Sequence, residues 1–203
     1  MFSHYSVSKK HRTPHTTLGG FGLIELMVSI SIMVILSAII LARQDSFNSA
    51  VLLRSQAYEI ALAIREVQLS AVSAASDGSG NFRSQHGVYI NTAAGSNTGY
   101  RIFRDANNNS FYNTGEEYGL QGHLDPRFVI ESIAMQGVSY SGNQLSIVFE
   151  RPNFDARFFS SAGNELTGAT AAVLTVRRVG TTGTGVGDIK TVEITSTGQI
   201  AVQ

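Results

Sequence analysis

Hydrophobic and polar positions divide the first part of this chain into two different helical patterns. Residues 21–42 carry a single charge, Glu25, and as a helix they would extend about 33 Å, enough to cross the hydrocarbon core of a bilayer. Residues 43–75 contain no glycine or proline, and apolar side chains recur on one helical face at Phe47, Val51, Ala57, Ile60, Ala61, Ile64, Val67 and Ala71. We predict one helix of about 55 residues, apolar all round in its first half and amphipathic in its second, where it should pack on a sheet.

After residue 80 the pattern changes to short apolar runs that are typical of strands. The expected strands are 87–90, 100–103, 127–131, 144–149, 171–176, 189–194 and 199–202. The last two should form a final hairpin, because residues 195–198 between them favour a turn. The expected loops are 91–99, 105–125, 150–168 and 180–187. A helix followed only by strands predicts an α+β fold, with the helix packed on an antiparallel sheet.

Charge and composition exclude several classes of protein. Residues 1–20 hold three of the fifteen basic residues and no acidic one, so the rest of the chain carries twelve basic and fifteen acidic groups, a net charge of −3. That balance argues against a nucleic-acid partner, although Arg151, Arg157, Arg177 and Arg178 could still form a local basic patch. The absence of cysteine excludes disulfides, a thiol nucleophile and a cysteine metal site.

The start of the apolar helix carries a specific motif. Gly20 before Phe21, the string Leu-Ile-Glu-Leu-Met-Val at 23–28 and the apolar run resemble the prepilin signature of type IV pilins and type II secretion pseudopilins. The match covers roughly residues 15–45 and departs at Gly22, where family members commonly carry threonine. The resemblance implies that a prepilin peptidase cuts after Gly20 and methylates Phe21. It also implies that Glu25 pairs with the N-terminal amine of an adjacent subunit.

An ordinary secretory signal is the main rival interpretation of this segment. Such a signal would be cut after its apolar region, so the whole helix would be lost. Here the apolar run is longer than a usual signal core, and the glycine precedes it. The basic residues Lys9, Lys10 and Arg12 favour a cytoplasmic N-terminus, with the helix projecting outward.

The resemblance also implies a domain organisation and a function. Residues 1–20 would be a leader peptide, 21–42 a transmembrane and assembly helix, and 43–203 a pilin-like periplasmic or extracellular head domain. The chain would be a single-pass protein of the inner membrane and a structural minor subunit of a type II secretion pseudopilus or a type IV pilus. Its partners would be the prepilin peptidase, other pilin or pseudopilin subunits, the inner-membrane assembly platform and, before assembly, membrane lipid.

The head domain leaves two questions open. Its helix at 58–71, the segment 149–152 and the hairpin at 196–200 resemble the H-type minor pseudopilins, but pseudopili and type IV pili share the same anchor. The alternative function is a binding role at a pilus tip, where the head would take up a ligand, an adhesion partner or DNA.

No group of residues predicts catalysis. His86 and His123 stand apart, without a nearby nucleophile or HxxxH spacing, as is usual for structural histidines. The glycine-rich stretch 183–187 lacks the following helix and acidic partner of a dinucleotide site. The carboxylates are scattered, at Asp125, Glu131, Glu150 and Asp155. We therefore expect that the chain is not an enzyme.

One loop has the spacing of a calcium site. It places oxygen ligands at positions one, three, five, nine and twelve, with a backbone carbonyl at seven, as in an EF-hand loop: Asp105, Asn107, Asn109, Asn113 and Glu116, with the carbonyl of Phe111. It departs from that pattern at Ser110, where glycine normally makes the sharp turn, and strands are expected to flank it instead of helices. The alternative is an Asn-rich turn whose side chains bond their own backbone.

Overall fold

The computed structural model describes residues 20, 22–73, 84–149, 153–183 and 187–203. Over these residues the chain forms one helix, α1 (Leu23–Val72), followed by ten strands, which confirms the α+β class. The strands are β1 (His86–Asn91), β2 (Gly99–Arg104), β3 (Gly122–His123), β4 (Phe128–Gln136), β5 (Gln144–Phe149), β6 (Ala156–Ser161), β7 (Asn164–Glu165), β8 (Ala171–Arg178), β9 (Ile189–Thr195) and β10 (Ile200–Val202). The chain divides into two compact units, one ending at Arg43 and the other, which we call the head unit, beginning at Gln44.

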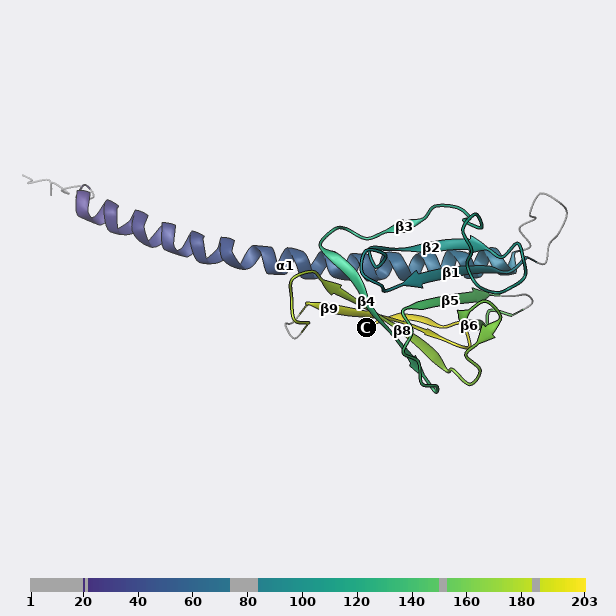
Figure 1. The fold of residues 1–203 in the computed structure, drawn as a ribbon. Coiled ribbons are helices and arrows are strands. Elements are labelled where there is room, and N and C mark those ends of the chain that lie inside the picture. Colours follow the sequence, from purple (N-terminus) through teal and green to yellow (C-terminus); the bar gives the residue numbers. More distant parts are fainter. Residues whose placement is uncertain (1–19, 21, 74–83, 150–152, 184–186) are drawn as a thin grey trace, which may run out of the picture. The chain divides into compact units, whose positions relative to one another are not determined.

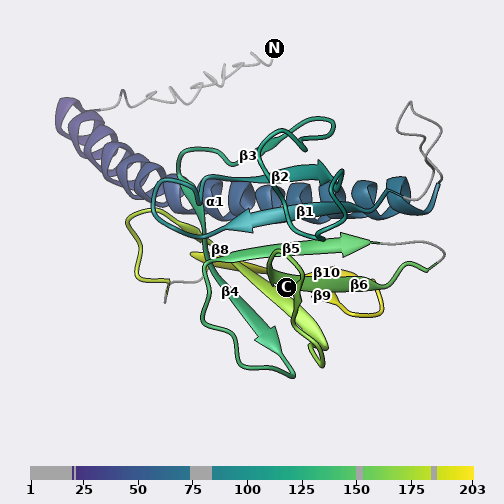
Figure 2. The same ribbon diagram turned by 45° about the vertical axis from the view of Figure 1, so that its right-hand side comes forward.

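The strands of the head unit form two antiparallel sheets (Figures 1 and 2). The larger sheet has six strands in the order β3-β2-β1-β5-β6-β7, and the smaller has four in the order β10-β9-β8-β4. In the larger sheet β1 lies between β2 and β5, and Tyr89 stands directly opposite Arg101 on β2. The predicted final hairpin is confirmed by the pairing of β9 with β10.

The second half of α1 packs on both sheets through a narrow apolar stripe. Its buried residues are spaced three or four apart, as one helical face requires: Leu53, Ala57, Ile60, Ile64, Val67 and Ala71. They share one core with side chains of β1, β2, β4, β5, β6, β8 and β9. The predicted stripe is wrong at its start, because Phe47 is 72% and Val51 52% exposed. The sheets contact the face that contains Leu53 instead.

A buried glutamine also ties α1 to the end of the chain. The side-chain amide of Gln68 donates hydrogen bonds to the carbonyls of Phe154, at 2.8 Å, and Gly198, at 2.9 Å. Gly198 has a φ of +80°, and a Cβ at this position would lie 2.0 Å from the Phe154 carbonyl oxygen. Only glycine fits a backbone with this conformation and so little space.

Both faces of the six-stranded sheet carry a cluster of apolar side chains. Side chains alternate between faces along each strand, so Val88 and Ile90 of β1 enter the main core while Tyr89 points to the other face. That outer face carries a second, smaller cluster, formed by Phe103, Val148 and Phe159 with Tyr89, Phe111 and Tyr112 against it. Two of these, Phe111 and Tyr112, belong to the loop in which we predict calcium.

All seven predicted strands are present, with ends that differ by a few residues. Three further strands were missed: β3 lies inside the predicted loop 105–125, and β6 and β7 lie inside 150–168. The predicted helix extends to residue 75, whereas α1 ends at Val72, and residues 74–83 lie outside the described residues.

Candidate functional site

The first candidate site is the apolar start of α1. Residues Leu23–Leu41 form the one stretch among the described helical residues that is long and apolar enough to cross a membrane. Its large apolar side chains are all more than half exposed within the chain, as expected for a segment that is covered by lipid or by other subunits. Gly20 is described and exposed, whereas Phe21 and the expected leader, residues 1–19, lie outside the described residues.

The polar groups of this segment are arranged for an apolar environment. The hydroxyl of Ser29 donates to the carbonyl of Glu25 at 2.8 Å, and that of Ser31 donates to the carbonyl of Met27 at 2.7 Å. These bonds satisfy both hydroxyls within the helix. Glu25 lies in the first turn of α1, where a negative charge interacts favourably with the helix dipole. Its carboxylate has no hydrogen bond or ion pair with the part of the chain that the structure describes.

The second candidate site is the loop from Asp105 to Glu116, whose first carboxylate is held by backbone amides. Asp105 is 1% exposed, and its two oxygens accept hydrogen bonds from the amides of Asn109, at 3.2 Å, and Ser110, at 2.7 Å. Asn108 and Ser110 both have a positive φ, at 58° and 59°. Ser110 thus adopts the left-handed backbone that glycine supplies in the EF-hand pattern, which removes the objection to a serine at this position.

The remaining predicted ligands also bond within the loop. Glu116 accepts from the amides of Ala106, at 3.2 Å, and Asn113, at 2.9 Å, so it lies back across the start of the loop. The side-chain oxygens of Asn107 and Asn109 each accept from the amide two residues later, as in Asx-turns, and the carbonyl of Phe111 accepts from the side chain of Asn113. The Asn-rich turn expected as the alternative is therefore present.

The hydrogen bonds within the loop do not use all the lone pairs of its carboxylates, so these oxygens could still bind a cation. A carboxylate has about four lone-pair sites, and Asp105 and Glu116 have no ion-pair partner within the described ranges. Two carboxylates with amide and carbonyl oxygens suit calcium, which binds oxygen ligands. The described residues contain no group of three His, Cys, Asp or Glu side chains that could hold a metal, so a site here would depend on neutral oxygens. Calcium at residues 105–116 remains a prediction.

The loop is anchored to the outer face of the six-stranded sheet by its aromatic residues. The amide of Tyr112 donates to the hydroxyl of Ser146 at 3.2 Å, and the ring centroids of Phe111 and Tyr112 lie 5.5 and 4.9 Å from that of Tyr89. Asn109 accepts, through its carbonyl, a hydrogen bond from the amide of Gly163 at 2.8 Å. The loop is thus part of the packed head unit, which the sequence did not indicate.

The other groups considered from the sequence do not form a site. His86 and His123 line different cavities. Of the expected basic patch, Arg157 pairs with Glu165 and Arg177 with Glu131, each at 2.7 Å, and Arg151 lies outside the described residues. These pairs neutralise the two arginines locally, which further weakens the case for nucleic acid.

Comparison with protein-family models, curated proteins and solved structures finds no match for this chain.

Proposed function

We propose that this chain is a membrane-anchored structural subunit of a type II secretion pseudopilus or a type IV pilus, of the minor pilin or pseudopilin class. The observation that carries the proposal is the start of α1, an apolar span directly after Gly20 in which the carboxylate of Glu25 has no partner among the described residues. A charge in such a segment is costly unless another group pairs with it. A neighbouring subunit is the partner that a fibre would supply.

The rest of the molecule is compatible with this role. The same helix that begins as an apolar span continues from Gln44 as the core helix of an α+β head unit. An anchor that is continuous with a folded head suits a subunit that is held in a membrane before assembly. In this proposal the head lies outside the cytoplasm, and the prepilin peptidase and the assembly platform of the inner membrane act on the anchor.

The test is the N-terminus of the mature protein, produced in a host that has a prepilin peptidase. Mass spectrometry should find a chain that begins at Phe21 and carries one added methyl group on its amine. The same host without the peptidase should give the uncut chain, which serves as the control. A mature chain that begins at Met1, or beyond residue 40, would show that the anchor is processed differently and would overturn the proposal.

A further inference from the structure

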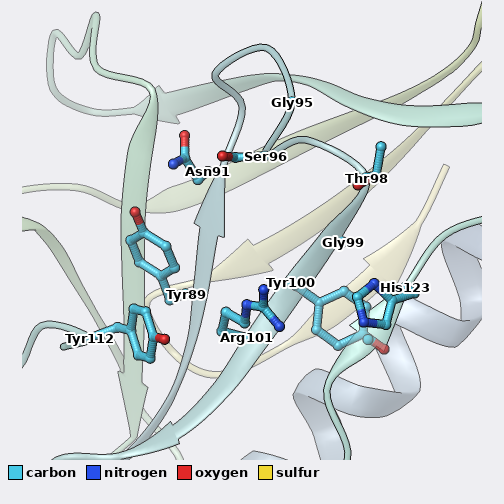
Figure 3. Close-up of a pocket in the computed structure, with 11 residues that line it drawn as sticks. Tyr89, Asn91, Gly95, Ser96, Thr98, Gly99, Tyr100, Arg101, Tyr112 and His123 are labelled. Atoms are coloured by element: carbon cyan, nitrogen blue, oxygen red, sulfur yellow. The ribbon is translucent and has the colours of Figure 1, made fainter. Parts of the chain in front are cut away.

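The outer face of the six-stranded sheet is hollowed by a groove with a volume of about 270 Å³. Most of its lining comes from β1, β2 and the loop between them, and the rest from β3 and the loop that ends at Glu116. We call it the outer-face groove and define it by Tyr89, Asn91, Ser96, Thr98, Arg101 and Tyr112. In Figure 3 the side chain of Arg101 lies between the two neighbouring tyrosines, Tyr89 and Tyr112, and the pair Tyr100 and His123. None of these residues has a role in the proposed function.

The register of the sheet explains why these side chains meet. Tyr89 and Arg101 are direct cross-strand partners, so both side chains rise from the same face. Gly99, also on that face, has no side chain, and a Cβ there would lie 2.3 Å from the carbonyl oxygen of Gly122. Glycine at this position lets the backbone of β3 approach β2 closely, so Gly99 and Gly122 line the groove beside Arg101 without side chains. Tyr112 forms another wall and is held in place by its contact with Tyr89, at 4.9 Å between ring centroids.

The charge of the groove favours an anion. Arg101 is exposed and has no hydrogen bond or ion pair with the residues that the structure describes. No carboxylate lines the groove. The nearby acid, Glu117, accepts hydrogen bonds from the Tyr112 hydroxyl and from the amide of Gly115, the latter at 2.9 Å. The pKa of Glu117 is lowered mainly by the hydrogen bond from Tyr112, and the charge of Arg101 adds only a weaker effect from beyond ion-pair distance. A guanidinium whose N–H groups have no hydrogen-bond partner presents a planar fork that binds a carboxylate through two parallel hydrogen bonds.

The remaining lining favours a ring that bears hydroxyl groups. Ser96 and Thr98 offer hydroxyls that both donate and accept hydrogen bonds. The side chain of Asn91 already accepts from the amide of Ala93, at 2.9 Å, and bonds to Tyr89, so it offers only its remaining capacity. The tyrosine rings offer rigid apolar faces against which the C–H groups of a sugar can pack. A volume of 270 Å³ is slightly below the ~300 Å³ at which pockets for drug-sized ligands begin, which suits one or two rings.

A peptide is the less suitable anionic ligand. Extended peptides bind a sheet by adding a strand to a free edge, where the backbone is unpaired. Here β1 is paired with both β2 and β5, and β2 with both β1 and β3, so neither main strand of the groove offers a free edge. We propose that the outer-face groove binds an acidic saccharide of one or two rings, with Arg101 on its carboxylate and Tyr89 and Tyr112 against its rings.

The experiment uses the full chain in a polyoxyethylene detergent, because a glycoside detergent would compete for the groove. Di-galacturonic acid is titrated against the protein and followed by isothermal calorimetry or saturation-transfer NMR, with the neutral galactose disaccharide and a capped di-glutamate peptide as comparisons. We expect saturable binding of the uronate and at least tenfold weaker binding of both comparisons. Arg101→Gln should weaken uronate binding about tenfold or more, since it removes a charged hydrogen-bonded contact of about 1.5 kcal/mol or more.

Two further variants keep the result interpretable. Lys190→Gln removes the same charge outside the groove and should bind the uronate as the wild type does. Ser96→Phe, in the exposed loop between β1 and β2, fills the groove without changing its charge and should abolish binding, and it decides the matter if Arg101→Gln does not fold. Absence of saturable uronate binding by the wild type, or unchanged binding in the folded Arg101→Gln protein, would overturn the proposal. So would equally tight binding of the peptide. The groove lies in the head unit, so each of these results is separate from N-terminal processing.

Discussion

At the scale of single residues, His86 combines burial with an unsatisfied ring nitrogen. Its Nδ1 lies 3.1 Å from the carbonyl oxygen of Ser84, whereas Nε2 is buried without a partner among the described residues. The ring meets Tyr118 edge-on, at 5.2 Å between centroids. Burial lowers the pKa of His86 below its ordinary value, and the charge of Arg104 lowers it further, although the bond to Ser84 acts in the opposite direction. Folding therefore makes His86 harder to protonate and favours its neutral state. Glu66, which lines the same cavity, is the nearby acid.

This neutral state predicts a loss of stability in mild acid. A pKa that is lower in the folded than in the unfolded chain means that the unfolded chain binds more protons, so stability falls as the pH drops below about 6.5. We expect the melting temperature of the full chain in non-ionic detergent to be lower at pH 5.5 than at pH 7.5. His86→Phe, which cannot titrate and keeps an aromatic ring beside Tyr118, should reduce this difference.

The control is the second histidine considered from the sequence, His123, which is exposed. His123→Gln should keep the pH dependence of the wild type. If His86→Phe loses as much melting temperature between pH 7.5 and 5.5 as the wild type does, another group is responsible.

At the scale of elements, α1 separates buried from exposed leucines on one helix. Leu53 is fully buried in the core, whereas Leu62 is 68% exposed. Leu53→Ala should lower the free energy of unfolding by about 2–5 kcal/mol, because it removes buried methyl groups and leaves a cavity. Leu62→Ala, the same change on the same helix, should stay within about 0.5 kcal/mol. Denaturant unfolding followed by circular dichroism measures both, and similar losses would show that the assigned core face is wrong.

The same helix shows what its sequence could not decide. Apolar residues occur on several faces of its second half, since Val51, Leu62 and Leu69 are exposed while Leu53 and Ile64 are buried. Periodicity predicted an amphipathic helix, but the buried face is fixed by the sheets, and these form from residues more than ten positions further along the chain. The buried face of α1 is therefore decided by long-range packing, which the periodicity of the helix alone does not contain.

Strand prediction succeeded where the apolar residues of a strand gave a clear pattern, and it failed where a strand is buried on both faces or is very short. The strand around Val88 and Ile90 was predicted from its apolar residues, which enter the main core. The adjacent Phe158 and Phe159 are both buried because Phe158 enters the main core and Phe159 the smaller cluster on the other face, so β6 does not keep the alternation of a half-buried strand. The two-residue strands β3 and β7 are too short to carry a period.

The loop at 105–116 shows the same limit at a candidate site. Its ligand spacing could be predicted from the sequence, since it depends only on the order of residues such as Asp105 and Glu116. The left-handed backbone of Ser110 could not, because serine rarely adopts it and no local signal requires it. The outer-face groove could not be predicted from the sequence either, because strand register and loop packing are what bring Arg101 and Tyr112 to the same groove.

Calcium should stabilise the folded chain if the loop binds it. With two carboxylates, a dissociation constant of about 1 mM is expected, as in extracellular modules. At 10 mM calcium this gives about 1.4 kcal/mol of stabilisation, or about 3–6 °C in melting temperature. Asp105→Ala should abolish the shift, whereas Asp125→Ala, which changes a carboxylate that is paired with Arg127, should keep it. If the wild type does not respond to calcium, or if Asp105→Ala responds as the wild type does, the loop is only a turn.

At the scale of the whole molecule, the chain places its two kinds of hydrophobic surface in different units. The head unit buries most of its large aliphatic residues between a helix and two sheets. Among the described residues of the first unit, the large apolar side chains from Leu23 to Leu41 are all exposed. A chain with this division needs an apolar environment for its first unit. Under the proposed function, a bilayer would supply it before assembly and the packed helices of other subunits would supply it afterwards.

The bilayer and the packed helices of a fibre would surround the carboxylate of Glu25 differently. Near the membrane interface its carboxylate can remain hydrated, but among packed helices an unpaired charge is expensive, so a fibre requires a partner for it. Glu25→Ala should therefore leave the chain inserted in the membrane, with a wild-type melting temperature for the head, and should strongly reduce the amount recovered in sheared and purified fibres. Glu25→Gln should behave similarly if charge pairing is what matters. Glu66→Ala, which removes an exposed carboxylate from the head part of the same helix, should be incorporated normally. Normal recovery of Glu25→Ala in fibres would mean that the carboxylate has no role in assembly, and that the proposed pairing between subunits is wrong.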